Sequence, residues 1–331
     1  MELSIILVTW RSYDYLRACI RSIYRETRDL IFEIIVVDNA SGDDSEAMIG
    51  KEFPNVKFFQ SRENLGFAKA NNLGYAHSSG SVLLFLNPDT EIRDNVFAEM
   101  VIHLRSQAAG AVGARLLNTD GSLQTSCVQA YPTICNQILD SEALRRLFPG
   151  SSLWGTRALF SNHGRPVNVD AISGACFMVK RDVFAGVGLF TEAYFMYAED
   201  LDLSYKITKS GKHVQYLPGC EVIHHGGTSS EKQGPFFANL CQRESLVQFF
   251  QNTRGRFYAK CYRAALAVSA ALRVGLLVLS LPFQRTVAKG DNAHGSLRKW
   301  LTNFQWAIGQ SIATRSNLAP ETSSRDLTLH T

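Results

Sequence analysis

Two aspartates stand directly after apolar, β-branched runs of the sequence. Asp38 follows the run 33–37, and Asp89 follows the run 81–86, from which Asn87 and a proline separate it. A carboxylate in the position of Asp38 can accept hydrogen bonds from a nucleobase or a ribose. The oxygens of Asn87 and Asp89 suit Mg²⁺ or Mn²⁺, which bind through one or two carboxylates plus substrate phosphates. Each aspartate could instead serve a turn or cap a helix, so both interpretations remain open at this point.

Three more carboxylates crowd the start of an expected helix. Glu199, Asp200 and Asp202 follow the aromatic, largely apolar run 193–197. Carboxylates at a helix start are favoured by the helix dipole, so capping alone could explain them. A carboxylate shielded from water by the aromatic run could instead have a raised pKa and act as a general base. Because residues two apart do not share a helical face, we expect different roles for Asp200 and Asp202.

A pair of histidines ends a short apolar run and meets two glycines. The pair is His224 and His225, followed by Gly226 and Gly227. A neutral imidazole can bind a divalent metal, and glycines allow a phosphate to approach the backbone closely. Histidines at a surface or in a core are common, however, and these residues alone do not decide between the two interpretations.

The elements that must position these side chains alternate between strands and helices. The sequence predicts strands over 3–9, 33–37, 55–60, 81–86 and 111–117 and helices over 15–24, 68–78 and 96–106. Such alternation predicts an α/β fold with a mostly parallel, doubly wound sheet flanked by helices. Ligands of these sheets bind at the carboxyl ends of the strands. Thr9, Asp38 and Asp89 stand at three such ends, so we expect a site there.

The second half of the chain gives weaker periodic patterns. We expect strands over 169–179, 214–217 and 222–225, helices over 182–187 and 199–210, and helical structure from residue 236 onward. The sequence thus predicts a domain over 1–235 and a helical C-terminal extension over 236–313. A polar tail over 314–331, which we expect to be flexible, completes the chain.

One segment of the extension, 264–283, is apolar except for Arg273 and two serines. Its length suits a membrane span of about 20 residues, but a charge near the middle of a span is costly. Arg263 before the segment, and Arg285 and Lys289 after it, favour docking on a membrane surface over a span or a helix packed in the body. Further basic residues precede it: Arg254, Arg256 and Lys260.

Composition narrows the class of protein. The chain has 331 residues, 46% of them hydrophobic, enough for one large α/β domain with an appendage or for two domains. The net charge of +4 is too small to indicate nucleic-acid binding. Seven scattered cysteines without a Cys-x-x-Cys pair argue against a disulfide framework and suit a reducing cytosol. The N-terminus shows no basic stretch or cleavage site of a signal peptide, so we expect a cytoplasmic location.

Seven stretches of the chain occur in an order that is typical of one enzyme family. They are residues 5–10 (IILVTW), 36–41 (VVDNAS), 63–72 (ENLGFAKANN), 85–89 (FLNPD), 173–178 (SGACFM), 195–203 (FMYAEDLDL) and 224–227 (HHGG). Together they resemble family 2 glycosyltransferases of the GT-A fold, especially the rhamnosyltransferase-like branch of bacterial surface polysaccharide synthesis. The resemblance covers about residues 3–230, and seven matches in order are far more specific than any one of them.

The resemblance implies a role for each matching side chain. Asp200 would deprotonate the acceptor hydroxyl, and Asp89 and His224 would bind a divalent metal, Mg²⁺ or Mn²⁺, at the donor diphosphate. Glu199, Asp202 and His225 could support them. The implied donor-binding residues are Thr9, Asp38 and Asn39 around the base and ribose, Asn64, Gly66 and Asn71 along the nucleotide, Asn87 beside the metal, and Gly174 and Ala175 facing the sugar.

The same resemblance implies the reaction. A sugar, rhamnose among the candidates, would pass with inversion from a UDP- or dTDP-linked donor to a hydroxyl of a glycan or lipid-linked acceptor. The enzyme would work on the inner face of the cell membrane. One departure bears on the metal: many family members have Asp where this chain has Asn87, so the site has one negative charge fewer.

Sequence features count against three other functions. A dinucleotide-dependent oxidoreductase is disfavoured because the loop 10–14 after the first strand contains no Gly-x-Gly-x-x-Gly. A sugar nucleotidyltransferase is disfavoured because no Gly-rich basic loop is present there to hold a triphosphate. The remaining alternative is a catalytically silent nucleotide-sugar-binding or scaffold protein on the same fold, against which the intact Asp38, Asp89, Asp200 and His224 count.

Overall fold

The computed structural model describes residues 1–106, 109–139, 147–148, 151, 165–226, 237–284 and 290–309, without the side chains of 106, 280–284 and 290–294. The predicted tail over 314–331 therefore lies outside the described residues. The same holds for Gly227, Arg285 and Lys289, on which parts of the sequence interpretation depend.

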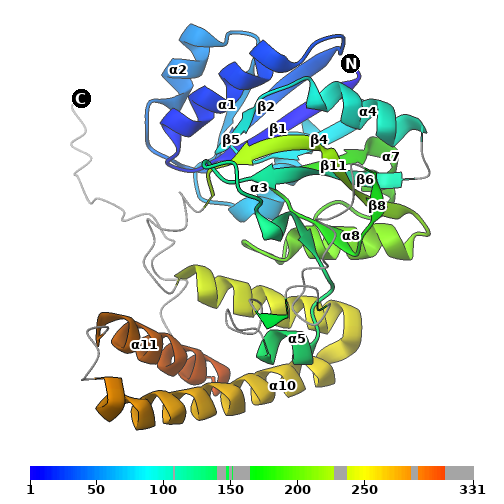
Figure 1. The fold of residues 1–331 in the computed structure, drawn as a ribbon. Helices are drawn as coiled ribbons and strands as arrows, with labels where there is room; N and C mark the ends of the chain where they lie inside the picture. Colours follow the sequence, from blue (N-terminus) through cyan, green and yellow to red (C-terminus); the bar gives the residue numbers. More distant parts are fainter. Residues whose placement is uncertain are drawn as a thin grey trace, which may run out of the picture.

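Strands and helices alternate through the first third of the chain, as predicted (Figure 1). The elements are β1 (Leu3–Thr9), α1 (Tyr13–Glu26), β2 (Phe32–Asp38), α2 (Ser45–Glu52), β3 (Lys57–Gln60), α3 (Gly66–Ala76), β4 (Val82–Leu86), β5 (Thr90–Ile92), α4 (Val96–Ser106) and β6 (Ala109–Leu117). Every residue of β1 and β4 is buried, which explains why their sequences are continuous apolar runs. Helix α2 and strand β5 were not predicted.

The rest of the chain adds short strands and then long helices. The elements are the 3₁₀ turn η1 (Thr125–Cys127), β7 (Val128–Gln129), α5 (Ile134–Ile138), β8 (Val167–Asn168), β9 (Ala171–Ile172), β10 (Cys176–Lys180), α7 (Arg181–Gly186), α8 (Glu199–Lys209), β11 (His213–His224), α10 (Phe237–Gln284) and α11 (Gly290–Ala307). Helix α10 bends at Gly255, whose φ of 87° is non-helical.

Nine of the eleven strands in the described ranges form one sheet with the order β3-β2-β1-β4-β10-β6-β11-β5, in which β8 also pairs with β11. Strands β7 and β9 pair with each other in a separate two-stranded sheet. Strands β3, β2, β1 and β4 are parallel, and so are β6 and β11. Strand β10 runs antiparallel to both β4 and β6, and β5 and β8 run antiparallel to β11. The predicted α/β sheet is confirmed, with a parallel N-terminal half and a mixed second half.

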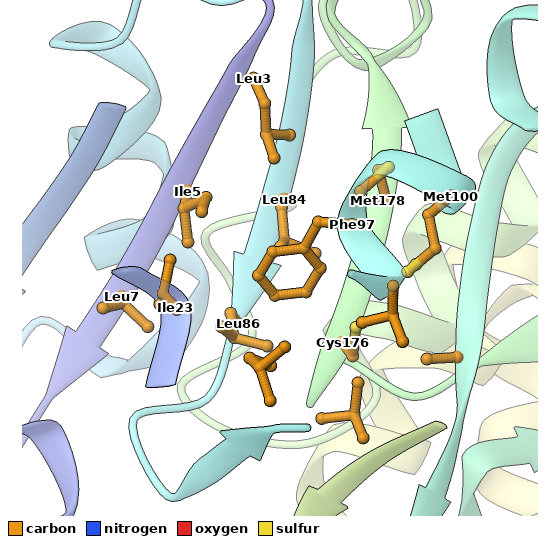
Figure 2. Packing of buried hydrophobic residues seen from close by; sticks show 14 of the residues in the cluster. Leu3, Ile5, Leu7, Ile23, Leu84, Leu86, Phe97, Met100, Cys176 and Met178 are labelled. Carbon is orange, nitrogen blue, oxygen red and sulfur yellow. The ribbon is translucent and has the colours of Figure 1, made fainter. Parts of the chain in front are cut away.

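Helices cover both faces of this sheet, and alternate residues of each strand pack on opposite sides. On one face Leu3, Ile5 and Leu7 of β1 pack with helices α1, α2 and α4, and Figure 2 shows Phe97 and Met100 of α4 over this layer. On the other face, the strand residues that alternate with these pack against α3, α7 and α8. The sheet is therefore a rigid platform whose strand ends can hold a site.

The C-terminal helices build a third apolar cluster. Residues of α10 and α11 pack there with Tyr194, Ala198 and Leu201 from around the start of α8. Figure 1 shows α10 and α11 on the side of α5 and α8, away from α1 and α2. The predicted apolar C-terminal helix is thus present, and its N-terminal half packs against the region that holds Asp200.

Two expected elements differ from the structure. The strand expected over 169–179 is broken into β9 and β10 by a turn at residues 173–175, where the backbone N–H of Gly174 donates to Asp200 instead of to a neighbouring strand. The two strands expected over 214–225 are one strand, β11, with a register shift between Leu217 and Glu221. Apolar periodicity identified both regions as extended but could not locate the interruption.

Candidate active site

The ends of β1, β2 and β4 meet at one edge of the sheet, as predicted. Thr9 lies opposite Asp38 in the parallel register, and Leu7 lies opposite Leu86, one residue before Asn87. Thr9 and Asp38 are buried, and the Thr9 hydroxyl is 2.9 Å from the hydroxyl of Ser12.

A turn holds Asp38 in place. The hydroxyl and the backbone N–H of Ser41 donate to its carboxylate, and Gln60 Nε2 lies 3.5 Å from Asp38 Oδ2. Burial raises the pKa of Asp38, and the Ser41 hydrogen bonds oppose that shift. Asp38 therefore does serve a turn, and its contact with a base or ribose stays a prediction.

The asparagines predicted along the nucleotide also shape the loop before α3. Asn39 Nδ2 donates to the Gly66 carbonyl at 3.1 Å, and the backbone N–H of Gly66 donates to Asn64 Oδ1 at 3.0 Å. Asn71 is buried and donates to the Phe67 carbonyl within α3 at 2.9 Å. These amides fix the loop that any nucleotide at this edge would meet.

The conformation of Gly66 is one that a larger residue could not adopt. Its φ is +77°, and a Cβ at this position would collide with the carbonyl oxygen of Phe195. The backbone N–H of Phe67 donates to that same carbonyl at 2.8 Å. The loop before α3 is therefore packed directly on the loop that leads to Asp200.

Asp89 and His224 approach each other from β4 and β11. Asp89 Oδ1 is 3.3 Å from His224 Nε2, and Asn87 Nδ2 is 3.2 Å from the same nitrogen. Asp89 and His224 are far apart in sequence, so the fold alone makes this pair. The two predicted metal ligands and Asn87 are thus brought together.

Gln124 fixes the orientation of the His224 ring. Its Nε2 donates to the His224 carbonyl at 2.6 Å, and its Oε1 is 2.8 Å from His224 Nδ1. Since that oxygen can only accept, Nδ1 carries a proton, and Nε2 is the nitrogen that faces Asp89 and Asn87. An imidazole oriented this way through its other nitrogen is the usual arrangement of a metal-ligating histidine.

This donor set fits a hard divalent cation that also contacts a diphosphate. Within the described ranges, no group of three or more His, Cys, Asp or Glu side chains could hold a metal by itself. Mg²⁺ and Mn²⁺ do not require such a group, because they bind through one or two protein ligands plus substrate phosphates and water. Asp89 and His224, with Asn87 beside them, match that requirement.

His225 lies apart from this pair. Its backbone N–H donates to the Asp89 carbonyl at 2.9 Å, but its ring nitrogen is 3.1 Å from the Thr119 hydroxyl and its ring is tilted by 48° against Tyr15, with 5.4 Å between the ring centres. Within the described residues, the backbone of His225 therefore supports the site, and its ring contacts Thr119 and Tyr15.

Asp200 is buried at the start of α8 and accepts hydrogen bonds on both oxygens. Gly174 N–H donates to Oδ2 at 2.9 Å, Leu201 N–H donates to Oδ1 at 2.8 Å, and Gln129 Nε2 lies 3.4 Å from Oδ2. Burial raises the pKa of Asp200, and these hydrogen bonds oppose the rise. A carboxylate that is fixed, desolvated and more basic than usual suits proton abstraction.

The neighbours of Asp200 have different surroundings. Asp202 accepts from the Thr191 hydroxyl at 2.6 Å and the Tyr194 hydroxyl at 3.2 Å, so it anchors the loop before α8. Burial and the adjacent Asp200 raise the pKa of Glu199, and among the described residues no donor reaches Glu199 Oε2. The predicted difference between Asp200 and Asp202 is visible in these contacts.

The loop before α8 is held in an unusual conformation. Tyr197 and Ala198 both have positive φ, 71° and 63°, which is costly for residues with a Cβ. The packing of this loop on Gly66 and the hydrogen bond from the Ser245 hydroxyl to the Met196 carbonyl hold it. The strain is local to the residues that deliver Glu199 and Asp200.

The turn at residues 173–175 connects the pair of predicted metal ligands, Asp89 and His224, with Asp200. Asn87 N–H donates to the Ala175 carbonyl at 3.0 Å, and Gly174 donates to Asp200. A Cβ on Gly174 would reach ordinary contact distance from Asp200 and from Phe67. Gly174 therefore lies between the loop before α3 and the carboxylate at the start of α8, where the resemblance places the sugar.

Three residues of this site were not found from the sequence: Gln124, Gln129 and Phe195. Gln124 and Gln129 lie in an irregular stretch whose glutamines contact residues about 70 to 100 positions away, and no local pattern encodes such contacts. Phe195 contributes its backbone carbonyl, which any residue could supply. Only the pairing of β11 with β6 and the placement of α8 reveal them.

Comparison with known proteins places the chain in a family. The family described as "Glycosyl transferase family 2" matches residues 4–188. An N-acetylglucosaminyl-diphospho-decaprenol L-rhamnosyltransferase of Mycobacterium tuberculosis is 28% identical over 293 residues, which are 84% of this chain and 93% of that protein.

Solved structures support the fold. GalNAc-T7 with UDP, GalNAc and Mn²⁺ aligns with a TM-score of 0.58 at 16% identity, over 93% of this chain and 57% of that one. The mannosyltransferase PcManGT from Pyrobaculum calidifontis, in complex with GDP-Man and Mn²⁺, aligns with a TM-score of 0.56 at 17% identity, over 93% and 86% of the two chains. The fold is that of the GT-A glycosyltransferases. Because the family match covers more than half of the chain, this protein belongs to glycosyl transferase family 2, as a rhamnosyltransferase-like member.

Proposed function

We propose that this glycosyltransferase moves a sugar, with inversion and in a metal-dependent reaction, from a nucleoside-diphosphate sugar to a hydroxyl of a glycan or lipid-linked acceptor. The observation that carries the proposal is the connection from the Asp89–His224 pair to Asp200 through the turn at residues 173–175. It supports one site with a leaving-group end and a proton-accepting end. The rhamnosyltransferase named above makes dTDP- or UDP-linked rhamnose the first donor to test.

In the proposed site, Asp89 and His224 hold the divalent cation, which supplies positive charge beside the leaving diphosphate. Asp38 and Thr9 contact the base and ribose, and the loop containing Asn64 and Gly66 lines the nucleotide. The buried edge of the sheet keeps these contacts rigid, so binding energy serves to position the anomeric carbon.

Asp200 is the proposed general base. It takes the proton of the acceptor hydroxyl while that oxygen forms a bond to the anomeric carbon and the bond to the diphosphate oxygen breaks. Attack opposite to the leaving group inverts the anomeric centre. The hydrogen bonds from Gly174 and Leu201 keep the carboxylate aimed, and its raised pKa increases its basicity.

We further propose two structural units and a location. Residues 1–235 would form the GT-A domain and residues 236–313 a helical extension, and the protein would work in the cytoplasm at the inner face of the cell membrane. All seven cysteines are free in the structure, which supports a reducing compartment.

The test is donor hydrolysis and sugar transfer with a panel of nucleotide sugars, with and without Mn²⁺. Asp89→Ala should abolish the metal stimulation, and Asp200→Asn should lower kcat by about 10²–10⁴-fold, the usual contribution of a general base. Asp182→Asn, an exposed carboxylate in the first turn of α7, is the control and should leave activity unchanged. Wild-type protein that binds a nucleotide sugar but shows no metal-stimulated turnover would instead identify a silent binding protein.

A further inference from the structure

Helix α10 contains a long stretch without any acidic residue. From residue 245 to its end at residue 284, the helix has no Asp or Glu but five Lys or Arg residues. The apolar part of this stretch belongs to a helix that is long and apolar enough to cross a membrane, and only 22% of its most apolar 18 residues are buried. A surface of this kind needs an explanation, because large exposed apolar patches are rare on soluble proteins.

Apart from Ala271 and Val278, the exposed apolar side chains after the bend form one row on the helix. They follow one another at spacings of seven, four, four, four and three residues, which places them in one row after the bend at Gly255. Those with large side chains are between 62% and 81% exposed. We call this row the docking face; it consists of Phe257, Ala264, Val268, Leu272, Leu276 and Leu279.

The opposite face of the same helix packs on the protein as far as Ala270. Tyr262, Leu266 and Ala270 are buried, and the first two pack in the cluster that includes Trp306 of α11. A helix with protein along one side and an exposed apolar row along the other is suited to lie flat on a surface rather than to cross a bilayer.

The arginine that seemed to oppose membrane contact is on the protein side. Arg273 NH2 donates to the Ile138 carbonyl at 2.6 Å, and its guanidinium lies 4.2 Å from the centre of the Trp300 ring. The charge therefore does not interrupt the docking face. Arg263, expected to face the membrane, instead donates to the Trp306 carbonyl at 2.8 Å.

The charges beside the docking face come from two other residues. Arg256 and Lys260 are exposed, and no ion-pair partner for either is found in the part of the chain that the structure describes. They precede the apolar row within the same helix. An apolar row with basic residues at one end is complementary to an anionic lipid surface.

We propose that the docking face binds the surface of an anionic lipid bilayer, with α10 parallel to the membrane and Arg256 and Lys260 at the phosphate headgroups. The inference deepens the proposed function and rests on it in one respect, because a lipid-linked acceptor would be presented at that surface. Binding to lipid itself depends only on the exposed face.

The experiment is flotation of the full-length protein with phosphatidylcholine vesicles, with and without phosphatidylglycerol. Leu276→Glu should weaken binding by about tenfold or more, the value of one buried leucine side chain. Arg256→Glu with Lys260→Glu should weaken binding to the anionic vesicles by about twentyfold or more and have little effect on neutral ones.

Matched controls exist on the sheet domain. Ile102 of α4 is 67% exposed against 68% for Leu276, so Ile102→Glu makes the same change elsewhere and should bind vesicles like the wild type. Lys51→Glu with Lys212→Glu, both exposed, is the control for the charge reversal. Donor hydrolysis in vesicle-free buffer should be equal in all these variants, which separates failure of docking from failure of the proposed reaction.

Three results would overturn the proposal. The first is wild-type protein that binds neither kind of vesicle, and the second is a Leu276→Glu variant that binds as well as the wild type. The third is a concentration-dependent dimer, seen by sedimentation, that Leu276→Glu converts to a monomer without changing vesicle binding; the occupant of the docking face would then be a second copy of the chain.

Discussion

Replacing Gln124 with alanine tests how the proposed metal site is held. The side chain makes two hydrogen bonds to His224, one to the ring at Nδ1 and one to the backbone carbonyl. Both of these bonds go to His224, so the substitution acts on the proposed metal site through the histidine. In Gln124→Ala the ring can rotate, and the proton is no longer confined to Nδ1.

The expected size of the effect follows from these two bonds. A hydrogen bond of this type contributes about 0.5–1.5 kcal/mol. Loss of both bonds therefore removes roughly 1–3 kcal/mol of the free energy that holds His224 in its orientation. This range corresponds to about a 5- to 150-fold loss of metal affinity, and it overlaps the roughly 10–100-fold loss typical of removing such a partner of a metal-binding histidine.

Mn²⁺ titrations of donor hydrolysis measure the loss. For Gln124→Ala we expect half-maximal activity at about 10–100 times more Mn²⁺, with kcat at saturating Mn²⁺ close to that of the wild type. Gln215→Ala is the control, because Gln215 Oε1 lies 2.8 Å from Nε2 of His103, a similar glutamine–histidine pair outside the site. An unchanged Mn²⁺ requirement in Gln124→Ala, or an equal change in Gln215→Ala, would refute the reasoning.

Two further predictions concern stability. Because burial and Asp200 raise the pKa of Glu199, the folded state keeps a proton that the unfolded state releases, so this group makes stability fall as pH rises from its ordinary value of 4.5 through the raised native value. Glu199→Gln should reduce that fall in Tm measured against pH, and Asp182→Asn should not. Gly66→Ala should lower the free energy of unfolding by more than about 1 kcal/mol, and Tm with it, because of its positive φ and the collision with Phe195. Gly50→Ala in α2, where nothing lies within 4 Å of the added Cβ, should leave Tm unchanged or raise it.

The parts of the fold that the sequence predicted well are those with strong, local apolar patterns. β1 and α4 begin and end where the periodicity indicated, and the polar residues after β1, β2 and β4 gather at one edge. The direction of a strand was harder to predict from the sequence, because alternation of apolar residues is the same in parallel and antiparallel strands. Strand β10 is antiparallel within a sheet that was expected to be mostly parallel.

In the site, too, residues with a local sequence signal were predicted and residues without one were not. Asp89 and His224 were selected by residue type and by resemblance, and the structure places their side chains 3.3 Å apart. Their catalytic roles stay predictions. Gln124 could not be selected, because an isolated glutamine in a loop has no local signature and its partner is 100 residues away. Residues that position others are generally found only when the tertiary structure is known.

Asn87 gives the proposed metal site a particular dependence on its donor. With Nδ1 of His224 bonded to Gln124, Nε2 faces Nδ2 of Asn87 at 3.2 Å and Oδ1 of Asp89 at 3.3 Å. Gln124 at Nδ1 and Asn87 at Nε2 are both neutral amides. Among Gln124, Asn87, Asp89 and His224, only Asp89 therefore supplies a full negative charge. An aspartate at position 87 would add a second one. In the proposed reaction the missing charge would come from the donor diphosphate, so we expect the cation to be held firmly only when the donor is bound. The neutral amide would thereby link metal affinity to the presence of the substrate.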